Sequence, residues 1–354
     1  MQQYILRRSI LNIFVLILVA TMVFGALRID SGSVVTQRAA GCFTQGDPEG
    51  IKRCKEIARL ELGLDGSIAE QYWDFMWDLS PLDLRGWSVS VGWPDLGLSF
   101  REKEPVIDEI AARLPASAEL GFLQIMVALL VAIPIGIISA IRQDSWVDYF
   151  LRFFSIAWLG IPVFVIAVFW VIAVGRWFED VAFLGAIPLV PGTLIADWGS
   201  PVGAEYKDIW EDPIANLQAM AAPALLGGLA TGAIIMRFLR SQMLEVLRQD
   251  YVRTAWSKGL KERVVVVRHA LKNALIPVLT LVGILLGSVI AGNVILENIF
   301  RINGVGFFVT SAVAQAPDFP VVQGIVIIVA GGLVFVNLAV DIIYGWLDPR
   351  IRYG

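Results

Sequence analysis

Six long stretches without a charged residue or histidine constrain this chain more than any other feature. Each has 19 to 24 residues, and a helix of about 20 residues crosses a hydrocarbon core about 30 Å thick. The stretches are residues 9–27, 120–141, 153–175, 213–236, 273–296 and 319–340. With 57% hydrophobic residues, the chain is more apolar than ordinary soluble domains. We therefore predict an all-α integral membrane protein with six transmembrane helices, which excludes secreted, fibrous and disordered classes.

A seventh uncharged stretch, residues 181–196, is shorter and contains Pro188 and Pro191. Proline removes a backbone hydrogen-bond donor and interrupts a helix, and lipid cannot replace the lost bonds. We therefore interpret this stretch as a re-entrant or surface segment.

The distribution of Lys and Arg predicts which side each segment faces. With a cytoplasmic N-terminus, the inner segments carry 15 Lys and Arg in 68 residues, and the outer segments carry 13 in 151. The inner segments are 1–8, 142–152, 237–272 and 342–354, and the outer segments are 28–119, 176–212 and 297–318. Because short cytoplasmic loops are enriched in positive charge, we predict that both termini are cytoplasmic. The first apolar stretch is too long for a typical signal peptide, so we expect a retained anchor.

The largest outer segment, residues 28–119, is expected to fold rather than to act as a linker. Apolar spacing predicts a helix over Ile51–Leu62. The next stretch, Ile68–Leu79, is rich in aromatic residues. Its rings either lie at the level of the lipid headgroups or form the core of a small packed cap.

The chain has only two cysteines, Cys42 and Cys54, and both fall in this outer segment. An oxidising compartment would allow a disulfide between them. Two free buried thiols are the alternative, and the sequence leaves both open.

Several kinds of chemistry have no sequence support. The chain has no phosphate-binding loop of the form G-x-x-x-x-G-K-[ST] and no cluster of metal ligands. Its single histidine, His269, lies beside Arg268 in a basic segment that suits a structural or solvated role. We expect a chain that is not an enzyme and needs no cofactor or metal, and the net charge of −4 gives no indication of nucleic-acid binding.

The interiors of the predicted spans lack ionisable residues, which ion-coupled carriers usually need. Energy for any transport is therefore expected to come from outside this chain. Small residues are frequent in the last three spans, for example at Gly228, Gly232 and Gly283. They predict close helix packing.

The inner segment 237–272 is too long for a turn and carries 9 basic and 3 acidic residues. Its apolar spacing predicts that the fourth span continues as an amphipathic helix. Thr254, Ala255 and Gly259 then place small residues at a short turn, where glycine can end a helix with a positive φ. Such a surface suits docking into the groove of a partner, although attraction to anionic lipid would equally explain the charge.

This segment resembles the coupling loop of dipeptide and oligopeptide permeases of ABC importers, specifically the first of their two membrane subunits. The resemblance rests on Asp250–Leu260 and Arg268–Pro277, and further matching stretches are Gly97–Phe100, Arg113–Ala116, Asp318–Gly324 and Leu347–Arg352. Two features depart from the family pattern. Asn303 stands where relatives commonly have proline, and residues 36–60 are longer than usual.

The resemblance implies a type I ABC-importer transmembrane fold in a bacterial or archaeal inner membrane. It divides the chain into residues 1–27, an extracytoplasmic segment 28–112, a transmembrane core 113–342 and a tail 343–354. The implied partners are a second homologous permease, two ATP-binding subunits, an extracytoplasmic substrate-binding protein and membrane lipid. The residues implied to couple the chain to the ATPase are Arg253, Thr254, Ala255, Lys258 and Gly259.

The expected cargo is a dipeptide or oligopeptide. Nickel chelates, opines and oligosaccharides remain open within the same architecture, because the neutral span interiors do not distinguish them. An autonomous secondary transporter or channel is the alternative from another class.

Overall fold

The computed structural model describes residues 2–29, 31–39, 48–62, 64–80, 82–83, 90–91, 94–180, 206–290, 293–314 and 317–347. The predicted re-entrant segment 181–196 and Cys42 lie outside these residues. The chain divides into two compact units. Unit 1 comprises Met1–Ile5, Pro115–Phe307 and Phe335–Gly354, and unit 2 comprises Leu6–Leu114 and Phe308–Val334.

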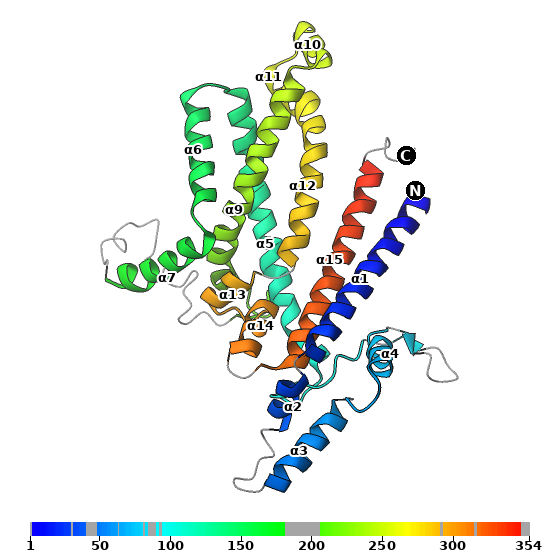
Figure 1. The fold of residues 1–354 in the computed structure, drawn as a ribbon. Helices are drawn as coiled ribbons and strands as arrows, with labels where there is room; N and C mark the ends of the chain where they lie inside the picture. Colours follow the sequence, from blue (N-terminus) through cyan, green and yellow to red (C-terminus); the bar gives the residue numbers. More distant parts are fainter. Residues whose placement is uncertain are drawn as a thin grey trace. The chain divides into compact units, whose positions relative to one another are not determined.

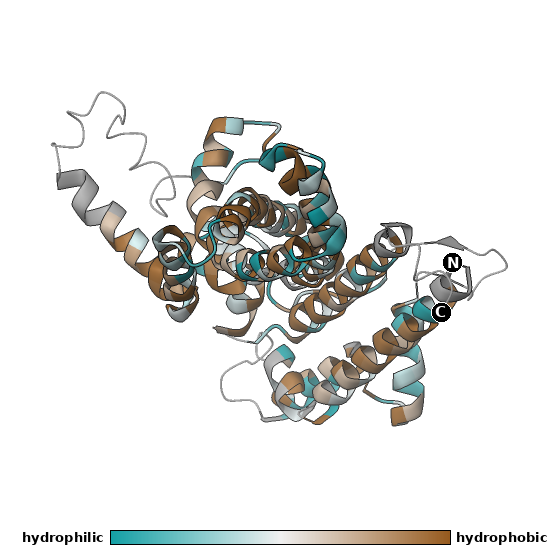
Figure 2. Cartoon of the chain, turned by 90° about the horizontal axis from the view of Figure 1, so that it is seen from above, coloured by the Kyte–Doolittle hydropathy of each residue, from teal (hydrophilic) through white to brown (hydrophobic). Residues whose placement is uncertain are grey.

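Among the residues that the structure describes, five helices are long and apolar enough to cross a membrane, which confirms the all-α membrane class (Figure 1). Two of the spans are entire helices, α5 (Val106–Ile141) and α9 (Pro213–Leu247). Two others are parts of longer helices: Leu6–Ala26 of α1 (Gln2–Ile29) and Phe319–Ile342 of α15 (Phe319–Leu347). The fifth, Glu262–Gly287, runs from α11 (Glu262–Val264) into α12 (Lys272–Ile290). Hydrophobic residues dominate these long helices (Figure 2).

The predicted span 153–175 is not one straight helix. It is divided between α6 (Trp146–Gly160) and α7 (Val163–Asp180), which meet at 90°. At the break, Ile161 adopts an extended conformation with φ −97° and ψ 120°. Pro162 explains this geometry, because the residue before a proline is disfavoured in a helix and proline itself has no backbone N–H. The bent pair counts as a sixth span only if its two halves are taken together.

The core of unit 1 forms where α5, α9 and α12 pack, with η3 (Val265–Leu271), a π-helical segment that leads into α12. Glycines permit this packing, as the sequence predicted. A Cβ on Gly228 would lie 2.7 Å from the Cβ of Val127 on α5. On Gly232 it would lie 3.2 Å from the backbone oxygen of Ala128. Larger residues at these positions would force α5 and α9 apart.

Unit 2 includes α2 (Ser31–Ala39), α3 (Pro48–Glu61), α4 (Ile68–Asp78) and a short antiparallel pair, β1 (Leu82–Asp83) and β2 (Ser90–Val91). The helix predicted over Ile51–Leu62 is thus present as α3, which begins three residues earlier and ends one residue earlier, and the aromatic-rich stretch Ile68–Leu79 forms α4. A capping box begins α4: the Ser67 hydroxyl accepts from the Glu70 N–H, and the Glu70 carboxylate accepts from the Ser67 N–H.

The aromatic residues of α4 divide between the two roles considered for them. Tyr72 packs edge-on against Phe24 of α1, with ring centroids 5.3 Å apart, and its hydroxyl lies 2.8 Å from that of Thr21. Trp73 and Trp77 are 63% and 43% exposed. Tyr72 is therefore part of a packed core, whereas the two tryptophans remain available to a surrounding interface.

Cys54 lies in the small core between α2 and α3, where it contacts Val35, Ala39 and Ala58. It is disulfide-bonded, but Cys42 lies outside the described residues, so the Cys42–Cys54 pair stays a prediction.

A bridge closing a loop of about 12 residues is expected to stabilise the fold by about 2–3 kcal/mol. Alkylation without reductant, followed by intact-mass measurement, should show no modified thiol. Two alkylated thiols would contradict the pairing.

Candidate functional site

The candidate site is built from the segment that follows α9 in unit 1. The helix α9 continues beyond its apolar part to Leu247, as predicted, and then stops. Gln249 adopts an extended conformation (φ −72°, ψ 149°) and begins α10 (Asp250–Ser257). The chain then turns through Lys258 and Gly259 into α11, η3 and α12.

Buried apolar contacts hold α10 in place. Val252 and Ala255 are 0% and 4% exposed and pack with Val265 of η3, against Val246 and Leu247 of α9. The exposed side of α10 carries polar side chains together with Tyr251 and Trp256, which are each 43% exposed. Because a helix of eight residues is marginal by itself, its stability here comes from the packing of its buried side.

A hydrogen bond also connects α10 with α12. The Asn273 side-chain amide donates to the hydroxyl oxygen of Tyr251 over 2.7 Å and to the backbone oxygen of His269 over 3.2 Å. The short helix α10 is therefore attached both to the end of α9 and to the beginning of α12.

The five candidate coupling residues differ in burial. Arg253, Thr254 and Lys258 are exposed, and the Arg253 side chain is 73% accessible. Ala255 is buried against η3, so its small side chain serves the packing of α10 within this chain. Four of the five residues therefore lie at the surface, and Ala255 is buried.

Gly259 has a φ of +74°, which confirms that the turn uses the left-handed region. Its N–H donates to the Trp256 backbone oxygen over 2.9 Å and closes the end of α10. A Cβ at this position would meet no atom of the described residues within 4 Å. The constraint at Gly259 is therefore conformational and leaves the space outside it open to a partner.

A groove of about 280 Å³ adjoins this surface. It is lined by Ala140, Ile141, Gln143, Leu244, Leu247, Arg248, Trp256, Glu262 and Val266. The residues come from the ends of α5 and α9 and the turns that follow them, and from α10, α11 and η3, so the groove borders α10 and two long helices. Sequence reasoning did not find this groove, because its walls are far apart in the chain.

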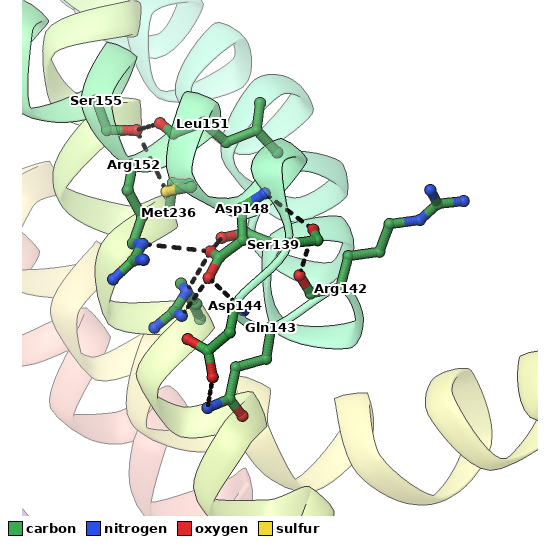
Figure 3. Close-up of polar contacts among 11 residues, drawn as sticks. Ser139, Arg142, Gln143, Asp144, Asp148, Leu151, Arg152, Ser155 and Met236 are labelled. Carbon is green, nitrogen blue, oxygen red and sulfur yellow. Dashed lines mark hydrogen bonds and ion pairs between the residues drawn. The ribbon is translucent and has the colours of Figure 1, made fainter.

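A buried ion pair fixes the neighbouring turn between α5 and α6. Asp148, with a fully buried side chain, accepts hydrogen bonds from both Nε (2.8 Å) and Nη2 (2.7 Å) of Arg240 on α9. Its oxygens also accept from the Ser139 hydroxyl (2.5 Å) and the Asp144 N–H (3.1 Å), as Figure 3 shows. This Asp148 clamp holds the α5–α6 turn, which contains the groove residue Gln143, against α9.

Another buried carboxylate, Glu297, lies in α13 (Val294–Phe300). It accepts from the Ser117 hydroxyl of α5 over 2.8 Å and from the N–H of Phe307 in α14 (Val305–Ala314) over 3.0 Å. Burial raises the pKa of Glu297, although the hydrogen bonds that it accepts oppose this. A Cβ on Gly304 would lie 2.5 Å from an oxygen of this carboxylate. The Gly304-x-Gly306 pattern thus allows this close approach to the carboxylate.

Comparison with known proteins identifies what kind of chain carries this surface. Residues 132–353 match the family described as "Binding-protein-dependent transport system inner membrane component", and residues 1–121 match the N-terminal family of such membrane components. The chain belongs to this family. As a binding-protein-dependent transport membrane component, it is a multi-pass integral membrane protein and a transport subunit.

Named relatives of this membrane component include several permeases. It is 33% identical over 362 positions to the dipeptide transport system permease protein DppB of Alkalihalophilus pseudofirmus, with 100% of both chains covered. It is 37% identical to DppB of Haemophilus influenzae, with 73% of this chain and 77% of the relative covered. It is 36% identical to the probable D,D-dipeptide transport system permease protein DdpB of Escherichia coli K12, with 84% of each covered.

Proposed function

We propose that this chain is the first of two homologous permease subunits in an ATP-driven importer of dipeptides or oligopeptides. The observation that carries the proposal is its similarity to dipeptide permeases along the entire length of both chains. Similarity restricted to the helices would support only a membrane fold. Here it also includes the segment around α10 and the N-terminal region.

The proposed complex contains a second permease, two ATP-binding subunits and an extracytoplasmic substrate-binding protein, surrounded by membrane lipid. Substrate would pass between the two permeases. We assign residues 113–342 to the transmembrane core, with residues 1–27 as the N-terminal tip and first span, 28–112 as an extracytoplasmic segment and 343–354 as a cytoplasmic tail.

We assign ATPase coupling to the α10 turn. Arg253, Thr254 and Lys258 are exposed and can contact an ATP-binding subunit, whereas Ala255 and Gly259 set the position and shape of the turn. Because α10 packs on α9 and η3 and is hydrogen-bonded to α12, a displacement of α10 would be transmitted to α9 and α12. Switching between two packed arrangements, driven from such an interface, is a recognised route to alternating access.

The proposed orientation places Lys207 outside and Arg142 inside, and both residues are exposed. We expect a membrane-impermeant thiol reagent to label Lys207→Cys in intact cells and Arg142→Cys only after permeabilisation. The parent chain, with only Cys42 and Cys54, gives the background. The reverse labelling pattern would invert the topology.

The experiment that tests the function is uptake by the reconstituted complex. We expect labelled dipeptide to enter vesicles only when ATP and the binding protein are both present. Uptake driven by an ion gradient without ATP would support an autonomous secondary transporter instead. Strict ATP dependence with a nickel chelate, an opine or an oligosaccharide as the only accepted cargo would retain the architecture and change the substrate.

A further inference from the structure

Unit 2 contains a cavity of about 680 Å³, a volume typical of small-molecule sites, which measure about 300–1,000 Å³. It lies where two apolar spans end. The span of α1 ends at Ala26, two residues before Arg28, and the span of α15 begins at Phe319. Arg28 and Phe319 both line the cavity. Because the ends of spans lie at the level of the lipid headgroups, this cavity is expected at that level.

One wall of the cavity offers a fixed cation. The Nε of Arg28 donates to Oε1 of Gln71 over 2.7 Å, and its guanidinium lies 4.7 Å from the centre of the buried Phe24 ring. Gln71 is only 9% exposed, and its own amide donates to the Gly66 backbone oxygen over 2.8 Å. Among the residues that the structure describes, no carboxylate forms an ion pair with Arg28. The Nη donors of this half-buried side chain thus remain available to an anionic group.

The same cavity also has acidic groups. Asp74 and Asp78 lie one turn apart on α4, and both line it. Asp95 joins them, because its backbone N–H donates to the Asp78 backbone oxygen over 2.8 Å. Phe75 and Leu96 contribute apolar wall between the charged groups. Carboxylates accept hydrogen bonds from a primary ammonium, which carries three donors.

We propose that this cavity binds a small zwitterion with an anionic group and a primary ammonium, the anion on Arg28 and the ammonium on the aspartates around Asp74. Two sources supply this chemistry: a short peptide with free termini, and the phosphoethanolamine headgroup of a membrane lipid. The site belongs to unit 2 alone and does not depend on which cargo the importer carries.

The test uses the full-length chain, purified with the subunits that accompany it, in nanodiscs. One arm measures binding of radiolabelled alanylalanine by equilibrium dialysis, with N-acetyl-alanylalanine amide, which lacks both charges, as the competitor that should fail. The other arm uses native mass spectrometry to compare retained phosphatidylethanolamine with retained phosphatidylcholine, whose quaternary ammonium has no N–H donor. Saturable binding in either arm supports the site and identifies the source.

Variants then locate the binding. Arg28→Gln and Asp74→Asn should each weaken it by about tenfold or more, as expected for loss of a hydrogen bond to a charged group. Arg59→Gln and Asp65→Asn are matched controls, because both residues are exposed in the same unit and neither lines the cavity. Size-exclusion profiles check folding, and Arg28→Lys keeps the charge if the neutral variant is unstable. Binding in neither arm, or equal loss in the cavity and control variants, would overturn the proposal.

Discussion

A Gly259→Val variant should insert and assemble normally but lose ATP hydrolysis stimulated by the binding protein, together with substrate uptake. Gly259 has a φ of +74°, a conformation that costs an L-residue about 1–2 kcal/mol and is worst for β-branched side chains. Because its position is surrounded by open space in this chain, the variant should relax by changing the turn rather than by disturbing the core. The turn would then present Lys258 in the wrong place relative to α10.

Two further variants distinguish backbone shape from other causes. Gly259→Asn adds a side chain but tolerates the left-handed region, so it should keep coupling if the conformation alone matters. If Asn fails as completely as Val, close approach by the ATPase subunit is the constraint. Lys261→Gln removes a nearby exposed charge without changing the backbone and should cost much less. Equal damage from Lys261→Gln would favour an electrostatic contact, and normal coupling in Gly259→Val would refute the coupling-turn assignment.

The sequence alone predicted the features of the fold that depend on local composition. Uncharged stretches located the apolar helices, and Gly259 has the positive φ expected of a glycine that ends a helix. Thr254 and Ala255, which were expected at a short turn, lie instead within α10. The break at Ile161 was missed because residues 153–175 are uniformly apolar, and hydropathy does not register a bend. Pro162 was the available signal, since it displaces its predecessor from helical geometry.

The candidate site was predictable as a segment but not as a surface. The residues around Gly259 are contiguous in sequence, so their pattern could be compared with a family. The burial of Ala255 against Val265 and the bond from Asn273 to Tyr251 depend on how the chain returns after the turn. The Asp148 clamp joins residues 92 positions apart, and no local pattern predicts such a pair.

Replacing one partner of the Asp148–Arg240 ion pair is expected to cause the largest loss of stability of any single substitution at a charged residue in the described part of the chain. The Asp148 side chain is fully buried, and that of Arg240 is 15% exposed. Removing one partner of a buried pair leaves an uncompensated charge and typically costs about 3–5 kcal/mol. Arg240→Gln should therefore lower the thermal unfolding midpoint of the complex strongly, and uptake should fall because the turn carrying Gln143 is no longer held against α9.

A double-variant cycle separates the ion pair from its surroundings. Asp148→Asn combined with Arg240→Gln removes both charges of the pair and keeps polar groups of similar size, although the partly exposed Arg152 also loses its contact with the Asp148 carboxylate. The loss of stability in the double variant should therefore be smaller than the sum of the two single losses. Arg152→Gln is the matched control, because Arg152 is 34% exposed and approaches Asp148 only to 3.5 Å. Its effect should be small, in line with partly exposed ion pairs. Additive losses in the double variant would show that Asp148 and Arg240 act independently, and the clamp would then not be the element that fixes the α5–α6 turn to α9.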